Sequence, residues 1–158
     1  MPAAMHGFYL RKLYLENKLV EPGGISLDGV DIDLTAIKTP SYFISTREDH
    51  IAPWKSTYAA TQTFSGPMRF VLGASGHVAG VVNPPAKNKY CYWLNDSYPE
   101  VPDEWLEGAK QFEGSWWVDW DKYLESFNGG ALVDARDPGT GDLPALADAP
   151  GTYVTMKA

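Results

Sequence analysis

The chain has 158 residues, 44% hydrophobic and 21% charged, an ordinary composition for one globular domain or part of one. Thirteen basic and twenty acidic side chains give a net charge of −7, which repels a phosphate backbone, so nucleic acid is not an expected partner. The single cysteine excludes an internal disulfide framework and a thiolate-rich metal cage, and no apolar run reaches the roughly 18 residues that span a membrane.

The N-terminal part lacks the basic start, apolar run and small-residue cleavage site of a secretory signal, which favours a cytoplasmic location. Residues 7–20 place apolar side chains near one helix face and charged ones largely elsewhere, so we expect a helix that begins almost at residue 1 and includes them. A Glu-Pro-Gly-Gly stretch ends it. Residues 25–34 then alternate loosely around an Asp-Gly turn, which is typical of a short irregular or hairpin segment.

Residues 41–73 have the order strand, helix, strand. SYFIST at 41–46 is rich in β-prone residues, and Pro53 suits the first turn of a helix over 54–64. MRFVLG at 68–73 follows as a second strand. This order predicts a βαβ unit with two parallel strands and a right-handed crossover.

The region after the second strand is predicted to be irregular and then helical. Pro84 and Pro85 exclude a long helix, and residues 87–102 are expected to be irregular with aromatic anchors. A helix is expected over 103–112, capped by Asp103.

The C-terminal region begins with another predicted helix, over 115–127, which Ser115 caps. A Gly-Gly pair ends it. The tail that follows is rich in Ala, Asp, Pro and Gly and is expected to be extended. Within it, residues 153–155 are expected to form a short strand or a docking segment.

Asp49 and His77 are the candidate acid–base pair. Asp49 follows the first predicted strand, and His77 follows the second, 28 positions later. Because parallel strands end at one edge of a sheet, the two side chains are expected to meet. In α/β-hydrolases the chain order is nucleophile, acid, histidine; the carboxylate fixes the tautomer of the histidine, which acts as general base.

A nucleophile for this pair is not identifiable in the sequence. The hydrolase turn needs Gly-x-Ser/Cys-x-Gly between a strand and a helix, and no such window occurs. The nearest match, residues 73–77, has His77 in place of the last glycine. Cys91 lies between two tyrosines without flanking glycines, which favours a structural thiol.

Four stretches carry a family resemblance. REDHIAPW (47–54) and GASGHVAGVVNPPAKNK (73–89) resemble the aspartate and histidine motifs of polyhydroxyalkanoate synthases, the α/β-hydrolase-like acyltransferases that polymerise hydroxyacyl-coenzyme A. FYLRKLYLENKLVEPGG (8–24) and APGTYVTMKA (149–158) resemble the same family. The NPPAKNK ending is most similar to the class I enzymes, which favour short units such as 3-hydroxybutyryl.

The resemblance implies an α/β fold, the C-terminal part of an α/β-hydrolase fold, with parallel strands, a crossover helix and an incomplete sheet. Residues 1–39 would be the remainder of a cap or lid region, residues 40–130 the C-terminal part of the hydrolase core, and residues 131–158 an extended tail. The family's N-terminal domain and first strands have no counterpart here. The chain therefore resembles the C-terminal portion of a longer enzyme.

By the same resemblance, Asp49 and His77 supply two members of a Cys-His-Asp triad, whose cysteine lies upstream of the matched part. In the family reaction a thiolate takes the acyl group from coenzyme A, and a chain-end hydroxyl then attacks the thioester. Asp49 either orients His77 or helps to deprotonate the hydroxyl. Without the cysteine, the isolated chain is expected to be inactive, and no cofactor or metal is implied.

The implied partners are a hydroxyacyl-coenzyme A substrate and a growing polyester chain. The missing N-terminal half, or another synthase subunit, is a further expected partner, with a homodimer for the full enzyme. The implied location is cytoplasmic, and the polyester granule surface is a candidate place within it.

His50, Lys87 and Lys89 are candidate substrate-binding residues. His50 either touches substrate or packs at the strand edge, and its position favours packing. The two lysines either meet the coenzyme A phosphates or form a solvated turn. These interpretations weigh equally, because no phosphate-binding loop or helix N-terminus is identifiable beside them.

Two alternative functions stay open. In the first, the chain is part of an esterase or depolymerase in which water replaces the growing chain as acceptor; a serine nucleophile would favour hydrolysis and a cysteine would favour transfer. In the second, it is a non-catalytic module that binds granules or a synthase through aromatic residues. Helical spacing favours core or interface roles for the tryptophans that such a module would use, Trp116, Trp117 and Trp120.

Overall fold

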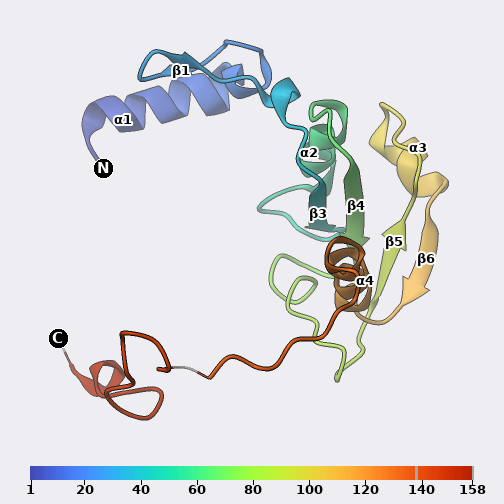
Figure 1. Ribbon diagram of the computed structural model, residues 1–158. Coiled ribbons are helices and arrows are strands. Elements are labelled where there is room, and N and C mark those ends of the chain that lie inside the picture. The colour runs from blue at the N-terminus through green and yellow to red at the C-terminus, as the bar shows by residue number, and fades with distance from the viewer. Residues whose placement is uncertain (138, 158) are drawn as a thin grey trace. The chain divides into compact units, whose positions relative to one another are not determined.

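The computed structural model describes residues 1–137 and 139–157. Its contacts divide the chain into two units, Met1–Lys122 and Tyr123–Ala158. The first unit contains a four-stranded mixed sheet with helices before and after its strands, which confirms the α/β class (Figure 1).

The N-terminal helix begins near residue 1, as expected, and ends earlier than the sequence predicts. α1 (Ala3–Phe8) continues as a π-helical stretch, Tyr9–Leu15. It stops before Asn17, whose φ of 48° places it in the left-handed region. The expected hairpin is confirmed: β1 (Ser26–Leu27) pairs antiparallel with β2 (Val30–Asp31).

The predicted strand, helix, strand unit is confirmed. β3 (Ser41–Thr46) and β4 (Met68–Gly73) are parallel, with Ser41 opposite Met68 at one end and Thr46 opposite Gly73 at the other. α2 (Trp54–Tyr58) lies between them in the chain (Figure 1). It is shorter than expected, because its last part tightens into a 3-10 turn. Among the described residues, short 3-10 turns lie at Lys18–Val20, Leu34–Ala36, Ala59–Gln62 and Tyr153–Thr155.

Two strands complete the sheet, and both correct the sequence prediction. β5 (Cys91–Leu94) pairs antiparallel with β4, although residues 87–102 were expected to be irregular. β6 (Lys110–Glu113) pairs antiparallel with β5, where a helix was expected to continue to residue 112. α3 (Pro102–Glu107) ends before Gly108, and the following residues gain ladder hydrogen bonds with β5 instead.

Of the two predicted N-terminal caps, Asp103 is wrong and Ser115 is confirmed. Asp103 lies inside the first turn of α3, because Pro102 occupies the first helical position and Val101 is the capping residue. The last helix, α4 (Trp117–Asn128), forms as expected, and the amide of Trp117 donates to Ser115 Oγ at 3.1 Å.

The described tail agrees with the expectation in its first part. Residues 131–137 have no regular structure, as expected of an extended segment. The expected short strand over 153–155 is wrong, because these residues form a 3-10 turn. Residues 138 and 158 of the predicted tail lie outside the described residues.

An aromatic core covers one face of the four-stranded sheet. Its central ring is Phe70 of β4, which meets Tyr58 edge-on at 5.2 Å and Trp105 edge-on at 5.1 Å between ring centroids. Since both partners come from helices, α2 and α3 pack on this face. The buried core residues are Trp54, Tyr58, Phe70, Leu72 and Trp105.

Candidate active site

The site is built where β3 and β4 end side by side. Beyond the paired ends of the strands, the Arg47 amide donates to the Gly73 carbonyl at 2.8 Å, and the Glu48 amide donates to the Ser75 carbonyl at 3.0 Å. These two bonds continue the parallel pairing into the loops. They hold the chain that carries Asp49 beside the chain that carries His77.

The expected contact between Asp49 and His77 is present. His77 Nδ1 lies 2.7 Å from Asp49 Oδ2. The other carboxylate oxygen, Oδ1, accepts the amides of Ile51 and Ala52, each at 2.9 Å. The Asp49 side chain is only 7% exposed, whereas that of His77 is 46% exposed. The acid is therefore held in the protein, and the imidazole reaches solvent.

These contacts fix which group carries the proton. The Ala52 amide, followed by the His77 and Ile51 hydrogen bonds, lowers the pKa of Asp49 to about 2. At neutral pH Asp49 is therefore a carboxylate, which only accepts hydrogen bonds. The proton between the two side chains must then lie on His77 Nδ1, which leaves Nε2 of a neutral imidazole free to accept a proton.

The two amides that bind Asp49 are contacts of the candidate site that the sequence analysis missed. They form because the Asp49 side chain bonds backbone groups two and three residues ahead, as aspartates often do in turns. That tendency, together with the proline at 53, is the signal in the sequence. It does not by itself show which aspartate of the chain folds back in this way.

The His77 loop requires a glycine at position 80. A Cβ atom there would lie 2.5 Å from the Ala74 carbonyl oxygen and 2.5 Å from Thr46 Cγ2. The Gly80 amide also donates to the Gly76 carbonyl at 2.9 Å, which closes a turn around His77. The loop is thus folded tightly against the end of β3, and any side chain at Gly80 would force it apart.

A groove of about 320 Å³ lies beside the residues that follow this turn. Its lining is almost entirely apolar and combines part of the His77 loop with the start of α4. The lining residues are Val81, Val82, Trp116, Trp117 and Trp120. The tryptophans therefore line a surface groove as well as packing on the sheet, where Trp120 meets Tyr42 edge-on at 4.6 Å.

The other candidate residues are not joined to the pair. The side chains of His50, Lys87 and Lys89 are exposed. None of these three side chains makes a hydrogen bond or ion pair with another side chain of the described residues; Lys89 is bonded by Asn83 only through its backbone. Their roles stay predictions. Cys91 lies on β5, and burial followed by the charge of Glu113 raises the pKa of its thiol. A raised pKa disfavours the thiolate, which agrees with a structural cysteine.

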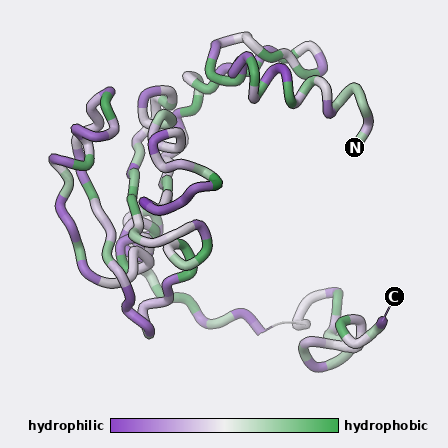
Figure 2. The backbone as a smooth tube through the Cα atoms, turned by 180° about the vertical axis from the view of Figure 1, so that it is seen from behind, coloured by the Kyte–Doolittle hydropathy of each residue, from purple (hydrophilic) through white to green (hydrophobic). Residues whose placement is uncertain are grey.

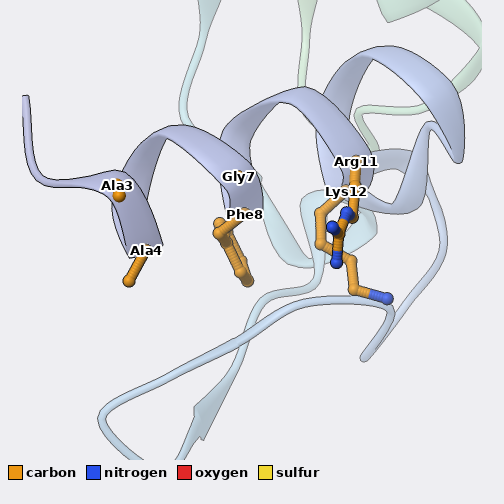
Figure 3. A pocket seen from close by; sticks show the side chains of 6 residues that line it. All are labelled: Ala3, Ala4, Gly7, Phe8, Arg11 and Lys12. Carbon is orange, nitrogen blue, oxygen red and sulfur yellow. The ribbon is translucent and has the colours of Figure 1, made fainter.

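A second hollow, of about 340 Å³, lies along α1 and the residues that continue it (Figure 3). The side chains that line it include Phe8, Arg11 and Lys12, without a carboxylate or an imidazole. It therefore lacks the acid–base groups of the Asp49–His77 site.

Over residues 1–137 and 139–157, no three His, Cys, Asp or Glu side chains gather in a way that suits a metal ion. No helix in the described part of the chain is both long enough and apolar enough to cross a membrane.

Comparison with known proteins identifies relatives along the whole chain. No family model matches. The "Poly(3-hydroxyalkanoate) polymerase subunit PhaC" of Cupriavidus necator is 46% identical over 158 residues, covering 100% of this chain and 27% of the relative. The protein of the same name from Rhizobium etli is 47% identical over 157 residues, covering 99% of this chain and 24% of the relative.

The chain is homologous to a C-terminal portion of poly(3-hydroxyalkanoate) polymerases. This confirms the resemblance drawn from the sequence motifs. A more distant relative, "Poly(3-hydroxyalkanoate) polymerase 2" of Ectopseudomonas oleovorans, is 37% identical over 157 residues, covering 99% of this chain and 28% of the relative. The chain thus spans about a quarter of the length of the polymerases that it matches.

Proposed function

We propose that this chain supplies the acid–base part of a poly(3-hydroxyalkanoate) polymerase, with His77 as general base and Asp49 as the carboxylate that orients it. The observation that carries the proposal is the 2.7 Å contact between His77 Nδ1 and Asp49 Oδ2 at the ends of two parallel strands. Similarity along this chain to about a quarter of the length of named polymerases supports the reaction class.

In the proposed reaction, the nucleophile is a cysteine thiol outside these 158 residues. His77 Nε2 takes the thiol proton, and the thiolate attacks the thioester carbonyl of a 3-hydroxyacyl-coenzyme A. The carbon–sulfur bond to coenzyme A breaks, and the departing thiolate receives the proton from the imidazolium. Asp49 stabilises the imidazolium between these two transfers.

The second half-reaction uses the same base. His77 removes the proton of a hydroxyl group, the hydroxyl oxygen attacks the enzyme thioester, and an ester bond forms. The cysteine leaves as a thiolate and regains the proton from the imidazolium. Each cycle therefore adds one ester unit and releases one coenzyme A, without a net change at the cysteine or at His77.

The environment of Asp49 favours orientation over direct proton abstraction. Two backbone amides and His77 satisfy its oxygens, and its pKa of about 2 makes it a weak base for a hydroxyl proton. The imidazole, in contrast, is 46% exposed and can reach a substrate. Asp49 thus suits the fixed position, and His77 suits the proton transfer.

The same proposal assigns the fold. In the described part of the chain, β3 pairs with β4 alone, so its other edge is open. We place β3 and β4 as late strands of an α/β-hydrolase sheet, whose earlier strands would come from the rest of the polymerase and pair along β3. Short 3-hydroxyacyl substrates of the class I type, assembly as a homodimer and action in the cytoplasm at the granule surface belong to this proposal.

A fusion protein tests the proposed function. These 158 residues replace the matched portion of the Cupriavidus necator polymerase, and coenzyme A release from 3-hydroxybutyryl-coenzyme A is followed together with polyester formation. His77→Ala is expected to lower the rate of coenzyme A release by about 10²- to 10⁴-fold, the usual contribution of a general base. Asp49→Asn is expected to lower it strongly as well, because the amide favours the wrong tautomer.

His6→Ala is the matched control, since His6 is exposed in the N-terminal helix, and it should leave the rate unchanged. A His77→Ala fusion that keeps more than about a tenth of the rate would refute the assignment, because general-base loss exceeds that amount. Coenzyme A release without polyester would assign the site to a hydrolase instead.

A further inference from the structure

The start of α4 is bonded to the loop that carries His77. Trp116 Nε1 donates to the carbonyls of Gly80 and Val81, each at 3.2 Å. Trp117 Nε1 donates to the Val81 carbonyl at 2.9 Å. These carbonyls lie three and four residues after His77, beyond the turn that closes around it. Two indole groups therefore bind the backbone that follows the candidate base.

Ser115 extends the same contact by one residue. Its hydroxyl, which is buried, donates to the Asn83 carbonyl. The Asn83 side chain is buried too, and it donates to the Lys89 carbonyl at 2.6 Å and accepts the Lys89 amide at 3.3 Å. Three consecutive side chains of one segment thus bind the loop over residues 80–83. The contact between Asn83 and the Lys89 backbone closes the part of the loop that follows.

The start of α4 is itself fixed to the sheet. Arg69 of β4 bonds both carboxylate oxygens of Asp119, one of them from Nε at 2.7 Å. Tyr42 of β3 donates its hydroxyl to the same carboxylate at 3.0 Å. The Asp119 side chain is only 8% exposed, so the ion pair is shielded on the helix side. Through Asp119, the segment that carries the loop's donors is therefore bonded to β3 and β4, the strands that position Asp49 and His77.

We propose that Trp116 and Trp117 are positioning residues for His77, acting through the carbonyls of Gly80 and Val81. The inference rests on the proposed function, in which the imidazole Nε2 must meet a thiol or hydroxyl while Nδ1 stays on Asp49. In the described residues the loop after His77 has no strand partner between Gly76 and Tyr90. Its own backbone bonds are local turns, such as that from the Val82 amide to the Val78 carbonyl, so these side-chain donors connect it to the segment before α4.

Tryptophan is suited to this task because its ring has only two rotatable torsions and one donor. A water molecule would satisfy the same carbonyls, but it would not transmit the position of α4 to the loop. Trp117 is 37% exposed, so much of its surface gains nothing from burial. Loss of the two indole donors should therefore leave the fold in place and let the imidazole move relative to the reacting atoms.

The first test observes the imidazole in the 158-residue chain. The chain has three histidines, His6, His50 and His77, so ¹⁵N ring signals are assigned with single variants. We expect a slowly exchanging Nδ1 proton on His77 in the unaltered chain. In the double variant Trp116→Phe/Trp117→Phe, that proton should exchange faster and the Nε2–H tautomer should gain population. An unchanged His77 signal in the double variant would overturn the inference.

Trp105→Phe is the matched control. It makes the same chemical change at a fully buried indole whose Nε1 has no hydrogen-bond partner among the described residues. It should lower stability at least as much as the double variant and leave the His77 tautomer unchanged. If Trp105→Phe alters the His77 signal equally, the effect reflects general loosening and the inference is wrong.

The second test measures catalysis in the fusion polymerase. Trp117 is replaced by 3-benzothienylalanine, which keeps the ring shape and removes only the N–H donor. We expect kcat to fall about tenfold with KM within about twofold, because displacing a catalytic group by a fraction of an ångström lowers the rate while substrate contacts remain. An unchanged kcat in a fusion that His77→Ala inactivates would refute the positioning role and leave the proposed function standing. A fusion unaffected by His77→Ala would refute both.

Discussion

The aromatic core beside β4 and the segment before β3 contain similar side chains in opposite environments. In the core, Tyr58, Phe70 and Trp105 have no exposed surface. Among residues 1–39, Ile25 is the single buried residue. Hydrophobic and hydrophilic residues alternate along the N-terminal helix (Figure 2). The large apolar side chains of this region are nevertheless exposed. Within residues 1–20, the exposed apolar side chains include Met5, Phe8, Tyr9, Leu10, Tyr14, Leu15, Leu19 and Val20.

The difference shows what an apolar pattern can and cannot establish. Amphipathic spacing indicates which face of a helix is apolar, but it does not show that another part of the same chain covers that face. In the core, rings from α2, β4 and α3 cover one another. The N-terminal segment holds its form through local backbone bonds, such as that from the Ile32 amide to the Ile25 carbonyl at 2.8 Å.

The largest expected effect comes from breaking the core. Trp105→Ala removes a ring that contacts Trp54, Tyr58 and Phe70, with centroid distances of 6.3, 5.8 and 5.1 Å. We expect the free energy of unfolding to fall by about 3–5 kcal/mol, the cost of truncating a buried aromatic side chain. Urea unfolding followed by circular dichroism measures it, and a loss below about 1 kcal/mol would show that the core is not the centre of stability.

A smaller loss is expected on the other face of the sheet. Arg69→Met removes the guanidinium that binds Asp119 and leaves a largely buried carboxylate with Tyr42 as its remaining described donor. We expect a loss of about 2 kcal/mol, in the range for hydrogen bonds to charged groups. The double variant Arg69→Met/Asp119→Leu should recover part of that loss in urea unfolding, because no uncompensated charge remains. A double variant less stable than the single one would contradict this account.

The sequence predicts the parts of the site that follow from topology. Two β-prone runs bounded by proline and glycine indicate β3 and β4, and their parallel order brings Asp49 and His77 to one edge. The sequence does not predict β5 and β6, because each strand has only four residues and is stabilised by pairing with a strand distant in the sequence. Lys110–Glu113 even favours a helix locally, and the pairing with β5 overrides that preference.

The remaining site contacts depend on loop geometry that periodicity does not encode. The amides of Ile51 and Ala52 face Asp49 only because the loop folds back after residue 49. The indoles of Trp116 and Trp117 meet the His77 loop because Asp119, at the start of α4, is bonded to Arg69 of the sheet. Helical spacing favours core or interface roles for these tryptophans, but it gives no information on the carbonyls that they bind.

The pH dependence of stability tests the environment of Asp49 at the candidate site. The folded pKa of Asp49, about 2, lies below its ordinary value of 3.8, so its ionised form stabilises the folded chain. That stabilisation is complete above the ordinary value and is lost as pH falls from about 4 through about 2. The unfolding midpoint in urea should therefore fall over this window, and Asp49→Asn should flatten the fall. A variant with the same pH dependence as the unaltered chain would contradict the lowered pKa.

The smallest effect is expected in the N-terminal segment. Tyr14 is 72% exposed and meets Tyr9 edge-on at 5.3 Å between ring centroids. Tyr14→Ala removes that pair without opening a cavity, so the free energy of unfolding should change by no more than about 0.5 kcal/mol, as for other surface substitutions. Amide hydrogen exchange in β4 should likewise stay unchanged. A loss above about 1 kcal/mol, or faster exchange in β4, would show that the segment unfolds together with the core rather than separately from it.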